Sequence, residues 1–348
     1  MNAPLSLRAL AGGDLSEMAL SWQQNNYHAE LPDKGMLRLY PRLPAQARLL
    51  ISVGVHGDET APLTILAPVL DAILRAPQAL SVDLLLVIGN PAALAAGKRF
   101  VDVDLNRLFH FPSDSKKLFQ GTSVEASRAT AIMPISTDFL SVVDVPKWHL
   151  DFHSTIRPSL HPCFAIVPTK NSGKGHQLLT TWLGQAGMDA IVYNDLPAAT
   201  FSAFTARHCG AFSCTVELGQ VGRLAAHEVT TFLLMQQAVS CLLRNPLPAM
   251  AEDSTNEKRI PTTHPPRYRV VQEIIKHQDD FKLKLPSDAC NFTAVPAGAA
   301  IAQEGQTLVH AGPEAEYALF PNPGVQLGQR AVLMLAAHKP DVDSSQDC

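Results

Sequence analysis

The stretch LLISVGVHGDETAP, residues 49–62, decides the fold of this chain. Five of its first seven residues are Leu, Ile or Val and none is charged, which is typical of a buried strand of a parallel sheet. Residues 63–75, LTILAPVLDAILR, place apolar side chains at helical spacing, and Pro62 suits a first helical turn. His56 and Glu59 therefore lie where a strand turns into a helix. In open α/β sheets this edge binds ligands.

Gly54 and Gly57 surround this turn and allow a tight bend, so that His56 and Glu59 can converge on one point. A neutral imidazole and a carboxylate are both ordinary zinc ligands. Two ligands do not make a site, however. For this pair alone the better interpretation is a polar loop, in which Glu59 caps the next helix and His56 is solvated.

Composition narrows the class of protein. The chain has 348 residues, of which 46% are hydrophobic and 17% charged, enough for one large core and a smaller second domain. The net charge of -4 and the lack of a dense basic run argue against a nucleic-acid partner. No apolar stretch is long enough to span a membrane, and residues 1–13 lack the apolar segment of a signal peptide. The six cysteines are scattered without a C-x-x-C pair, which predicts reduced thiols and a cytoplasmic location. The sequence leaves the oligomeric state open.

Apolar runs alternate with helical segments along the first two thirds of the chain. This alternation predicts a doubly wound α/β sheet. Residues 1–40 are mixed and amphipathic, and we expect them to be peripheral. The further predicted strands are 82–89, 147–152, 163–168, 189–194 and 211–219, and residues 227–245 form an amphipathic helix.

The composition changes at residues 251–266, which are charged, Pro-rich and without periodicity. We place the domain boundary there, which gives a large first domain over 1–255 and a second domain over 265–348. Short β-prone pieces separated by Gly and Pro fill the second part of the chain. They predict a small β-rich C-terminal domain.

A second histidine completes the set of candidate ligands. His153 follows the predicted strand 147–152, so that the carboxyl edge of one sheet presents His56, Glu59 and His153 together. Two histidines and one glutamate form the three-ligand set of a catalytic zinc. Glu217, in TVELG, arrives at the same edge and is the natural general base for water. Each histidine alone also fits a satisfied loop or core residue, so the pattern by itself leaves both interpretations open.

Five motifs occur in the order and spacing of a known family: HGDE, Asn90–Pro91, GKRFVDVDLNRLF, DFHSTIRPSLHP and TVELG. With these motifs the chain resembles the zinc-dependent, carboxypeptidase-like amidohydrolases, and within them the succinylglutamate desuccinylases. The related aspartoacylases share HG-x-E and DLNR but differ after the second histidine, where this chain has HSTIRPSLHP. The resemblance covers residues 45–225 firmly and the C-terminal domain loosely.

The resemblance implies a fold and a set of roles. The fold would be a zinc-carboxypeptidase-like mixed sheet flanked by helices, with a smaller β-rich C-terminal domain. His56, Glu59 and His153 would hold one zinc ion per chain. Glu217 would be the base that activates water, and Arg99 would polarise the scissile carbonyl. These roles suit amide hydrolysis, because negative charge develops on the carbonyl oxygen and a fixed guanidinium with a Lewis-acid metal stabilises it.

The resemblance also implies a small-molecule partner, an N-acyl dicarboxylic amino acid. Asn106 and Arg107 would hold one of its carboxylates, since arginine offers a planar, bidentate donor. Arg157 is a candidate for a further carboxylate clamp, and the alternative is a surface arginine bonded to its own loop. We predict that Asp102 and Asp104 form salt bridges with neighbouring arginines. Ser154 is a candidate support for the metal, and Cys214 is predicted to be a buried hydrophobe rather than a nucleophile.

The implied activity is zinc-dependent hydrolysis of N-succinyl-L-glutamate to succinate and L-glutamate, the last step of arginine degradation by the succinyltransferase route. One alternative is another N-acyl-amino-acid deacylase, of the aspartoacylase type, and another is a carboxypeptidase. A third is a zinc-binding module without catalysis. The presence of both Glu217 and Arg99 argues against the third, because a binding module needs no water-activating base.

Overall fold

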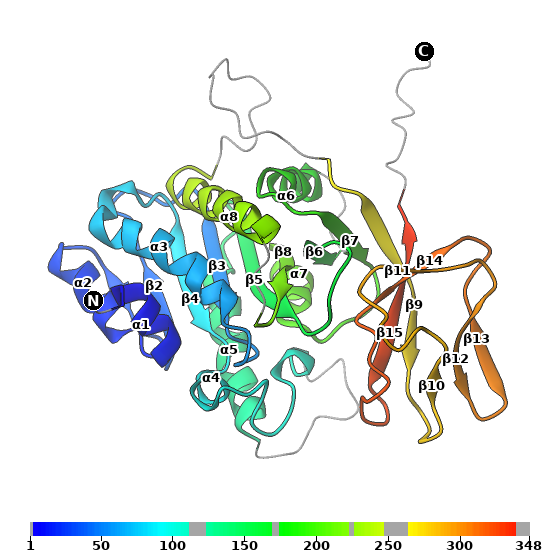
Figure 1. Ribbon diagram of the computed structural model, residues 1–348. Coiled ribbons are helices and arrows are strands. Elements are labelled where there is room, and N and C mark those ends of the chain that lie inside the picture. The colour runs from blue at the N-terminus through cyan, green and yellow to red at the C-terminus, as the bar shows by residue number, and fades with distance from the viewer. Residues whose placement is uncertain (1–2, 111–122, 169–173, 223–225, 247–263, 339–348) are drawn as a thin grey trace, which may run out of the picture.

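The computed structural model describes residues 3–110, 123–168, 174–222, 226–246 and 264–338. Within them one 12-stranded sheet runs through the molecule in the order β1-β2-β4-β3-β5-β8-β6-β7-β9-β15-β14-β11, and a three-stranded sheet has the order β10-β12-β13 (Figure 1). The strands are β1 Ala29–Glu30, β2 Met36–Leu39, β3 Arg48–Val53, β4 Asp83–Ile88, β5 Lys147–Thr155, β6 Cys163–Pro168, β7 Ala190–Asn194, β8 Phe212–Gln220, β9 Arg267–Ile275, β10 Lys282–Leu283, β11 Thr293–Val295, β12 Ala300–Glu304, β13 Thr307–His310, β14 Glu316–Leu319 and β15 Arg330–Ala337. The helices are α1 Leu5–Gly12, α2 Ser16–Gln24, α3 Ala61–Arg75, α4 Pro91–Ala96, α5 Val124–Phe139, α6 Lys174–Gln185, α7 Phe201–Cys209 and α8 Ala226–Arg244, with short 3-10 turns η1 Pro77–Ala79 and η2 Leu105–Arg107.

The large sheet is mixed. Strands β4, β3, β5 and β8 run parallel to one another, whereas β6 is antiparallel to β8 and parallel to β7. Helices α1, α3, α6 and α8 share a hydrophobic core with one face of the sheet, and α5 and α7 cover the other face. The predicted α/β fold with a mixed sheet flanked by helices is therefore confirmed. The antiparallel direction of β6 relative to β8 could not be predicted, because an apolar run does not show which way its strand runs in the sheet.

The N-terminal segment is not peripheral, and that prediction is wrong. Leu10 and Trp22 are fully buried. Helix α1 packs against α3, and β2 pairs antiparallel with β4. Short amphipathic helices bury one apolar face, and β2 extends the sheet beyond its parallel part. The segment 3–40 thus completes the core.

The C-terminal part is β-rich, as predicted, and it shares the large sheet. Strand β9 pairs parallel with β7, with Ile191 opposite Arg267. The sheet therefore passes without a break from the α/β part into the C-terminal strands (Figure 1). The predicted boundary at 251–266 falls mostly outside the described residues and stays a prediction. Among the helices that the structure describes, none is both long and apolar enough to cross a bilayer.

Candidate active site

The loop between β3 and α3 carries the first two candidate ligands. Gly54 has a φ of +61°, a left-handed conformation that favours glycine. A Cβ on Gly57 would lie 2.2 Å from the carbonyl carbon of Ala93, so only glycine fits this close approach. The two glycines thus allow the bend that turns His56 and Glu59 toward the same point, as the sequence predicts.

The third candidate comes from a neighbouring strand. His153 lies inside β5, because this strand continues to Thr155 rather than ending at the predicted residue 152. In the parallel pairing of β5 with β8, His153 stands opposite Glu217. The strand register therefore places the candidate base beside the candidate ligand.

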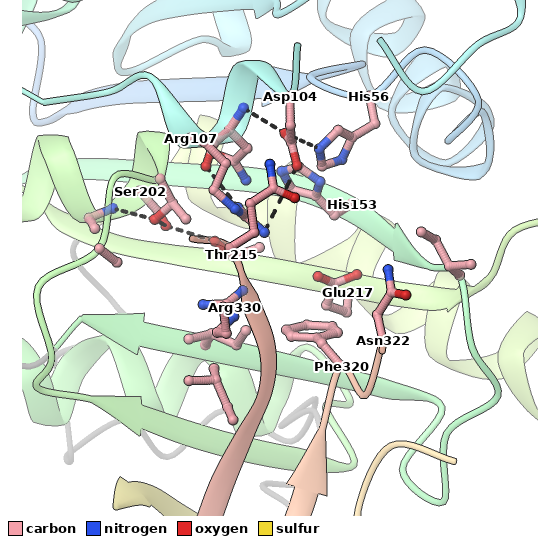
Figure 2. A pocket seen from close by; sticks show the side chains of 18 of the residues that line it. His56, Asp104, Arg107, His153, Ser202, Thr215, Glu217, Phe320, Asn322 and Arg330 are labelled. Atoms are coloured by element: carbon pink, nitrogen blue, oxygen red, sulfur yellow. Dashed lines mark hydrogen bonds and ion pairs between the residues drawn. The ribbon is translucent and has the colours of Figure 1, made fainter. Parts of the chain in front are cut away.

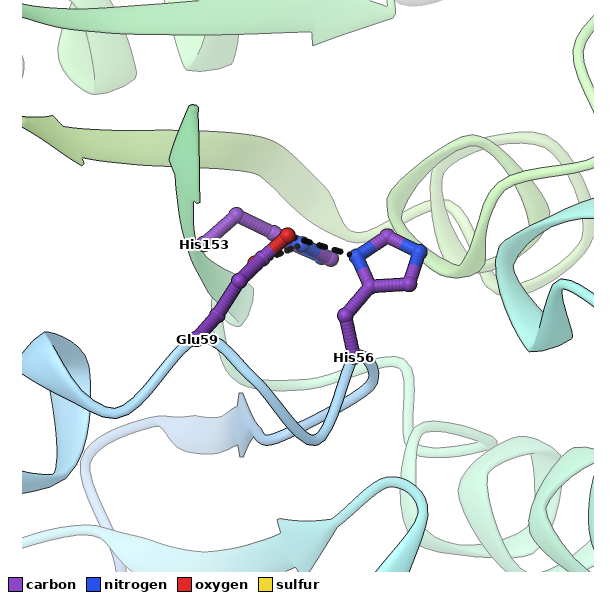
Figure 3. Close-up of side chains that lie close together, drawn as sticks. All are labelled: His56, Glu59 and His153. Atoms are coloured by element: carbon purple, nitrogen blue, oxygen red, sulfur yellow. Dashed lines mark hydrogen bonds and ion pairs between the residues drawn. The ribbon is translucent and has the colours of Figure 1, made fainter. Parts of the chain in front are cut away.

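The three candidate ligands form one compact cluster (Figure 3). His56 Nδ1 lies 2.9 Å from Glu59 Oε1, and His153 Nδ1 lies 2.9 Å from Glu59 Oε2. The residues His56, Glu59 and His153 are 3%, 2% and 2% exposed, and their ligand atoms all lie within 4.8 Å of one another. Two imidazoles and a carboxylate that converge in this way can hold a metal ion.

Two aspartates hold the far side of the imidazoles. Asp104 Oδ1 lies 2.9 Å from His56 Nε2, and Asp151 Oδ2 lies 3.2 Å from His153 Nε2. A proton on Nε2 leaves the Nδ1 lone pair free, and a carboxylate in this position is the usual support for a metal-binding histidine. Our sequence analysis missed both roles. For Asp151 a signal exists, since it lies two residues before His153 and therefore on the same face of a strand.

Glu59 receives further support at both oxygens. The Ser154 backbone N–H donates to Oε2 at 3.0 Å, and the Arg99 guanidinium donates to Oε1 at 2.8 Å. Burial by itself raises the pKa of Glu59, but the charges of His56 and His153 outweigh burial and hold this pKa well below its usual range. Glu59 is thus an ionised carboxylate. The support from Ser154 comes from its backbone and not from its hydroxyl.

Glu217 differs from Glu59 in its surroundings. It is 6% exposed, and its Oε2 has no hydrogen-bond partner among the described residues. Burial raises the pKa of Glu217 to about 7, and the charge of His153 opposes this shift. A buried carboxylate with one free oxygen and a pKa near neutrality can both accept and return a proton.

These groups line a cavity of about 890 Å³ (Figure 2). The cavity is bounded by the ends of β5 and β8, by the loop around η2, and by residues of the C-terminal domain such as Phe320, Asn322 and Arg330. The predicted site residues His56, Glu59, Arg99, Asn106, Arg107, His153, Arg157 and Glu217 all line it. The fold therefore brings the whole predicted set together around one cavity.

The predicted substrate-binding residues lie at different depths. Asn106 is 5% exposed, and its Oδ1 accepts a hydrogen bond from Phe201 N at 2.9 Å, which leaves its amide NH₂ as a donor. The Arg107 side chain is 43% exposed, and its Nη1 donates to the Asn106 carbonyl at 2.9 Å. Arg157 is half-buried, and its guanidinium donates to the Ala289 carbonyl at 3.3 Å. Its partner is thus in the C-terminal domain rather than in its own loop.

The remaining predictions have mixed outcomes. Asp104 lies 3.9 Å from Arg107 through Oδ2, as predicted, in addition to its contact with His56. Asp102 instead accepts a hydrogen bond from the Val124 backbone N–H at 2.9 Å, and among the described residues Arg99 pairs with Glu59 and Arg107 with Asp104, so the salt bridge predicted for Asp102 is not found there. Cys214 is fully buried, and burial raises the pKa of its thiol far above the ordinary value, which confirms the prediction of a buried hydrophobe.

The fold and the site together define a hydrolytic enzyme with a mixed α/β sheet, whose cavity combines a histidine–glutamate–histidine cluster, a buried carboxylate and several arginines. Residues 45–243 match the model of the succinylglutamate desuccinylase/aspartoacylase catalytic domain, and residues 263–338 match the barrel-sandwich hybrid domain of the same proteins. The chain belongs to the succinylglutamate desuccinylase/aspartoacylase family. The resemblance seen in the motifs is therefore confirmed, and it extends over the C-terminal domain.

Individual relatives support this assignment over most of their length. The chain is 35% identical to the succinylglutamate desuccinylase of Erwinia tasmaniensis over 305 residues, which cover 86% of this chain and 88% of the relative. The crystal structure of the Vibrio cholerae succinylglutamate desuccinylase matches with a TM-score of 0.77 and 30% identity, and covers 90% of both chains. The Chromobacterium violaceum enzyme matches with a TM-score of 0.74 and 28% identity, and covers 98% of this chain and 100% of that one.

Proposed function

We propose that this chain hydrolyses the amide bond of N-succinyl-L-glutamate, with zinc as its metal, to give succinate and L-glutamate. The observation that carries the proposal is the convergence of His56, Glu59 and His153 beside Glu217, in a cavity lined by arginines. The desuccinylases to which the chain is similar support the choice of substrate. The cytoplasmic location and the part in arginine degradation stay predictions.

The residues present fit a zinc ion. Both imidazoles turn Nδ1 toward Glu59, and a carboxylate lies at each Nε2, so that His56, Glu59 and His153 would hold the ion through two nitrogens and one oxygen. When bound, zinc supplies a Lewis acid for the carbonyl and lowers the pKa of a coordinated water.

The protein's own groups move the protons. Glu217 would accept a proton from the attacking water at its free Oε2 and pass it to the departing nitrogen of glutamate. Its pKa of about 7 suits both steps, because the carboxylate must be basic enough to take the proton and acidic enough to return it. Arg99 lines the cavity next to Glu59 and would stabilise negative charge that develops on the carbonyl oxygen.

The substrate carboxylates need cations. Arg107 offers a planar fork of donors, and the Asn106 amide NH₂ lies beside it in sequence, so that the pair would hold one carboxylate. Arg157 would be available for another carboxylate, with one of its donors already anchored on Ala289.

Product analysis tests the proposal directly. The purified, zinc-loaded protein is incubated separately with N-succinyl-L-glutamate, with N-acetyl-L-aspartate and with a dipeptide that ends in glutamate. We expect succinate and glutamate from the first substrate at the highest kcat/KM. Faster cleavage of N-acetyl-L-aspartate would favour an aspartoacylase-type deacylase, and faster cleavage of the dipeptide would favour a carboxypeptidase. No turnover of any substrate would favour a zinc-binding module.

A further inference from the structure

Another arginine of the cavity, Arg330, comes from the C-terminal domain. It is the first residue of β15, and its side chain is 16% exposed although it lines the cavity. In the view of Figure 2, Arg330 lies below Thr215, and Arg107 and Ser202 lie above it. A cation in this position lies within the catalytic cavity but belongs to no motif of the α/β part of the chain.

A β-bulge aims the side chain of Arg330 into the cavity. Both Arg330 and Leu333 line the cavity, yet residues three apart on a regular strand face opposite sides of the sheet. In the pairing of β15 with β9 the register shifts between Arg330 and Val332, which lie opposite Ile275 and Ile274. The extra residue brings Arg330 to the side of Leu333, and bulges near active sites commonly re-aim a side chain in this way.

The guanidinium of Arg330 lacks a close partner. Among the described residues it makes no hydrogen bond, and its one ion pair is with Glu273, whose Oε1 lies 3.8 Å from Nη1; the charge of Asp104 acts on it from farther away. Burial and then the like charge of Arg107 together lower the pKa of Arg330 to about 10, against the opposing charges of Glu273 and Asp104. Arg330 is therefore still charged at neutral pH. This end of the cavity sets two arginines against two carboxylates, Asp104 and Glu273, at 3.8 Å or more, so the donors of the Arg330 guanidinium stay open to an anionic ligand.

The arrangement of the two arginines selects among the carboxylates of the substrate. Arg330 and Arg107 are near enough to affect one another electrostatically. The α- and γ-carboxylates of glutamate lie on one small moiety, three carbons apart, whereas the succinyl carboxylate lies across the scissile amide. If Arg107 holds one carboxylate of glutamate, the second carboxylate of the same moiety lies within reach of its neighbour.

We propose that Arg330 binds the side-chain carboxylate of the glutamate moiety and so makes the enzyme specific for an acidic amino acid as leaving group. The inference rests on the proposed function. The C-terminal domain would then take a direct part in substrate selection. The succinyl carboxylate would be bound by a different cation of the cavity, such as Arg157.

Steady-state kinetics with three substrates test this assignment. Wild type and Arg330→Gln are compared on N-succinyl-L-glutamate, on N-succinyl-L-glutamine, which lacks only the charge of the γ-carboxylate, and on N-acetyl-L-glutamate, which lacks the acyl carboxylate. We expect Arg330→Gln to lose at least about tenfold in kcat/KM on both glutamate substrates and to change little on the glutamine substrate. Arg330→Lys should keep part of the preference, because it retains the charge without the fork.

Several outcomes would overturn this inference and leave the proposed function intact. One is an equal loss on the glutamate and glutamine substrates, another is no loss at all, and a third is a loss that disappears with N-acetyl-L-glutamate. If Arg330→Gln does not fold, Arg330→Lys carries the test, and an unchanged glutamate-to-glutamine preference in it would count against the inference. Arg8→Gln, at an exposed arginine paired with Glu17, is the matched control and should leave all rates unchanged. A wild type that fails to cleave N-succinyl-L-glutamate would instead overturn the proposed function, and this inference with it.

Discussion

The two ends of the cavity are built in opposite ways. At the histidine end the imidazoles and Glu59 are almost completely buried, and each is held by a partner within 3.2 Å. At the arginine end the Arg107 side chain is 43% exposed, and Arg330 has a carboxylate no closer than 3.8 Å. With the roles proposed above, the difference teaches that the protein preorganises the metal-binding groups, whereas the arginines leave donors for the substrate.

The largest effect is expected at the histidine end. His56→Ala, Glu59→Ala and His153→Ala each remove one of three donors, so the metal content of the purified protein should fall and hydrolysis should be lost. Metal analysis by mass spectrometry, at one ion per chain for wild type, checks this expectation. If the double variant His56→Ala, His153→Ala keeps a full equivalent of zinc, the ligand assignment is wrong.

The second prediction separates the base from the ligands. Glu217→Gln keeps the shape of the side chain but cannot accept a proton, so turnover should drop by roughly 10²-fold or more while metal stays bound. Metal content and kcat are measured on the same sample. Loss of zinc in this variant would show that Glu217 belongs to the ligand cluster instead.

The third prediction concerns the arginine end. Arg107→Ala should weaken binding and slow turnover together, because part of the binding energy positions the amide for attack, and Arg107→Lys should recover only part of the loss. Replacing succinyl by acetyl in the substrate leaves a cation without its partner, which costs on the order of 1 to 3 kcal/mol. Wild type should therefore prefer N-succinyl-L-glutamate over N-acetyl-L-glutamate by at least about tenfold in kcat/KM. Equal rates would rule out recognition of the acyl carboxylate.

The smallest effect on catalysis is expected at His149, which lies on β5 four residues before His153; here the predicted effect is on stability. This fully buried side chain contacts Ser52 Oγ at 2.8 Å and Thr205 Oγ1 at 2.7 Å, and burial lowers the pKa of His149 to about 4 against the opposing charge of Asp151. Because the unfolded chain protonates near pH 6.5, stability is lost as the pH falls from about 6.5 toward about 4.

Urea unfolding of wild type and His149→Gln at pH 7 and at pH 4.5 measures this contribution. The decrease in the free energy of unfolding between the two pH values should be smaller in His149→Gln by roughly 2 kcal/mol. Glutamine keeps polar contacts with Ser52 and Thr205 but does not titrate. An identical decrease in both proteins would mean that His149 is not held neutral by burial.

The predictable part of this protein is local in the chain. The apolar runs identified β3, β4, β6 and β7 to within two residues at each end, because a buried strand needs an unbroken set of apolar side chains. His56 and Glu59 share one loop, and Gly54 and Gly57 reveal its bend, so their convergence was visible from spacing. His153 and Glu217 could be predicted to lie near each other, because both occur near the carboxyl ends of predicted strands of the same sheet.

The features that sequence reasoning missed are not local. Asp104 reaches His56 across 48 positions of the chain, and Arg330 enters the cavity because a bulge in β15 turns it inward. The order and direction of the strands, and the packing of helices α1 and α2 into the core, likewise depend on how whole elements meet. The sequence by itself determined which residue types carry the chemistry and where the strands run. Tertiary structure decided which side chains meet, because contacts between distant segments depend on strand pairing and register. The hydrophobic periodicity of the sequence shows neither of these.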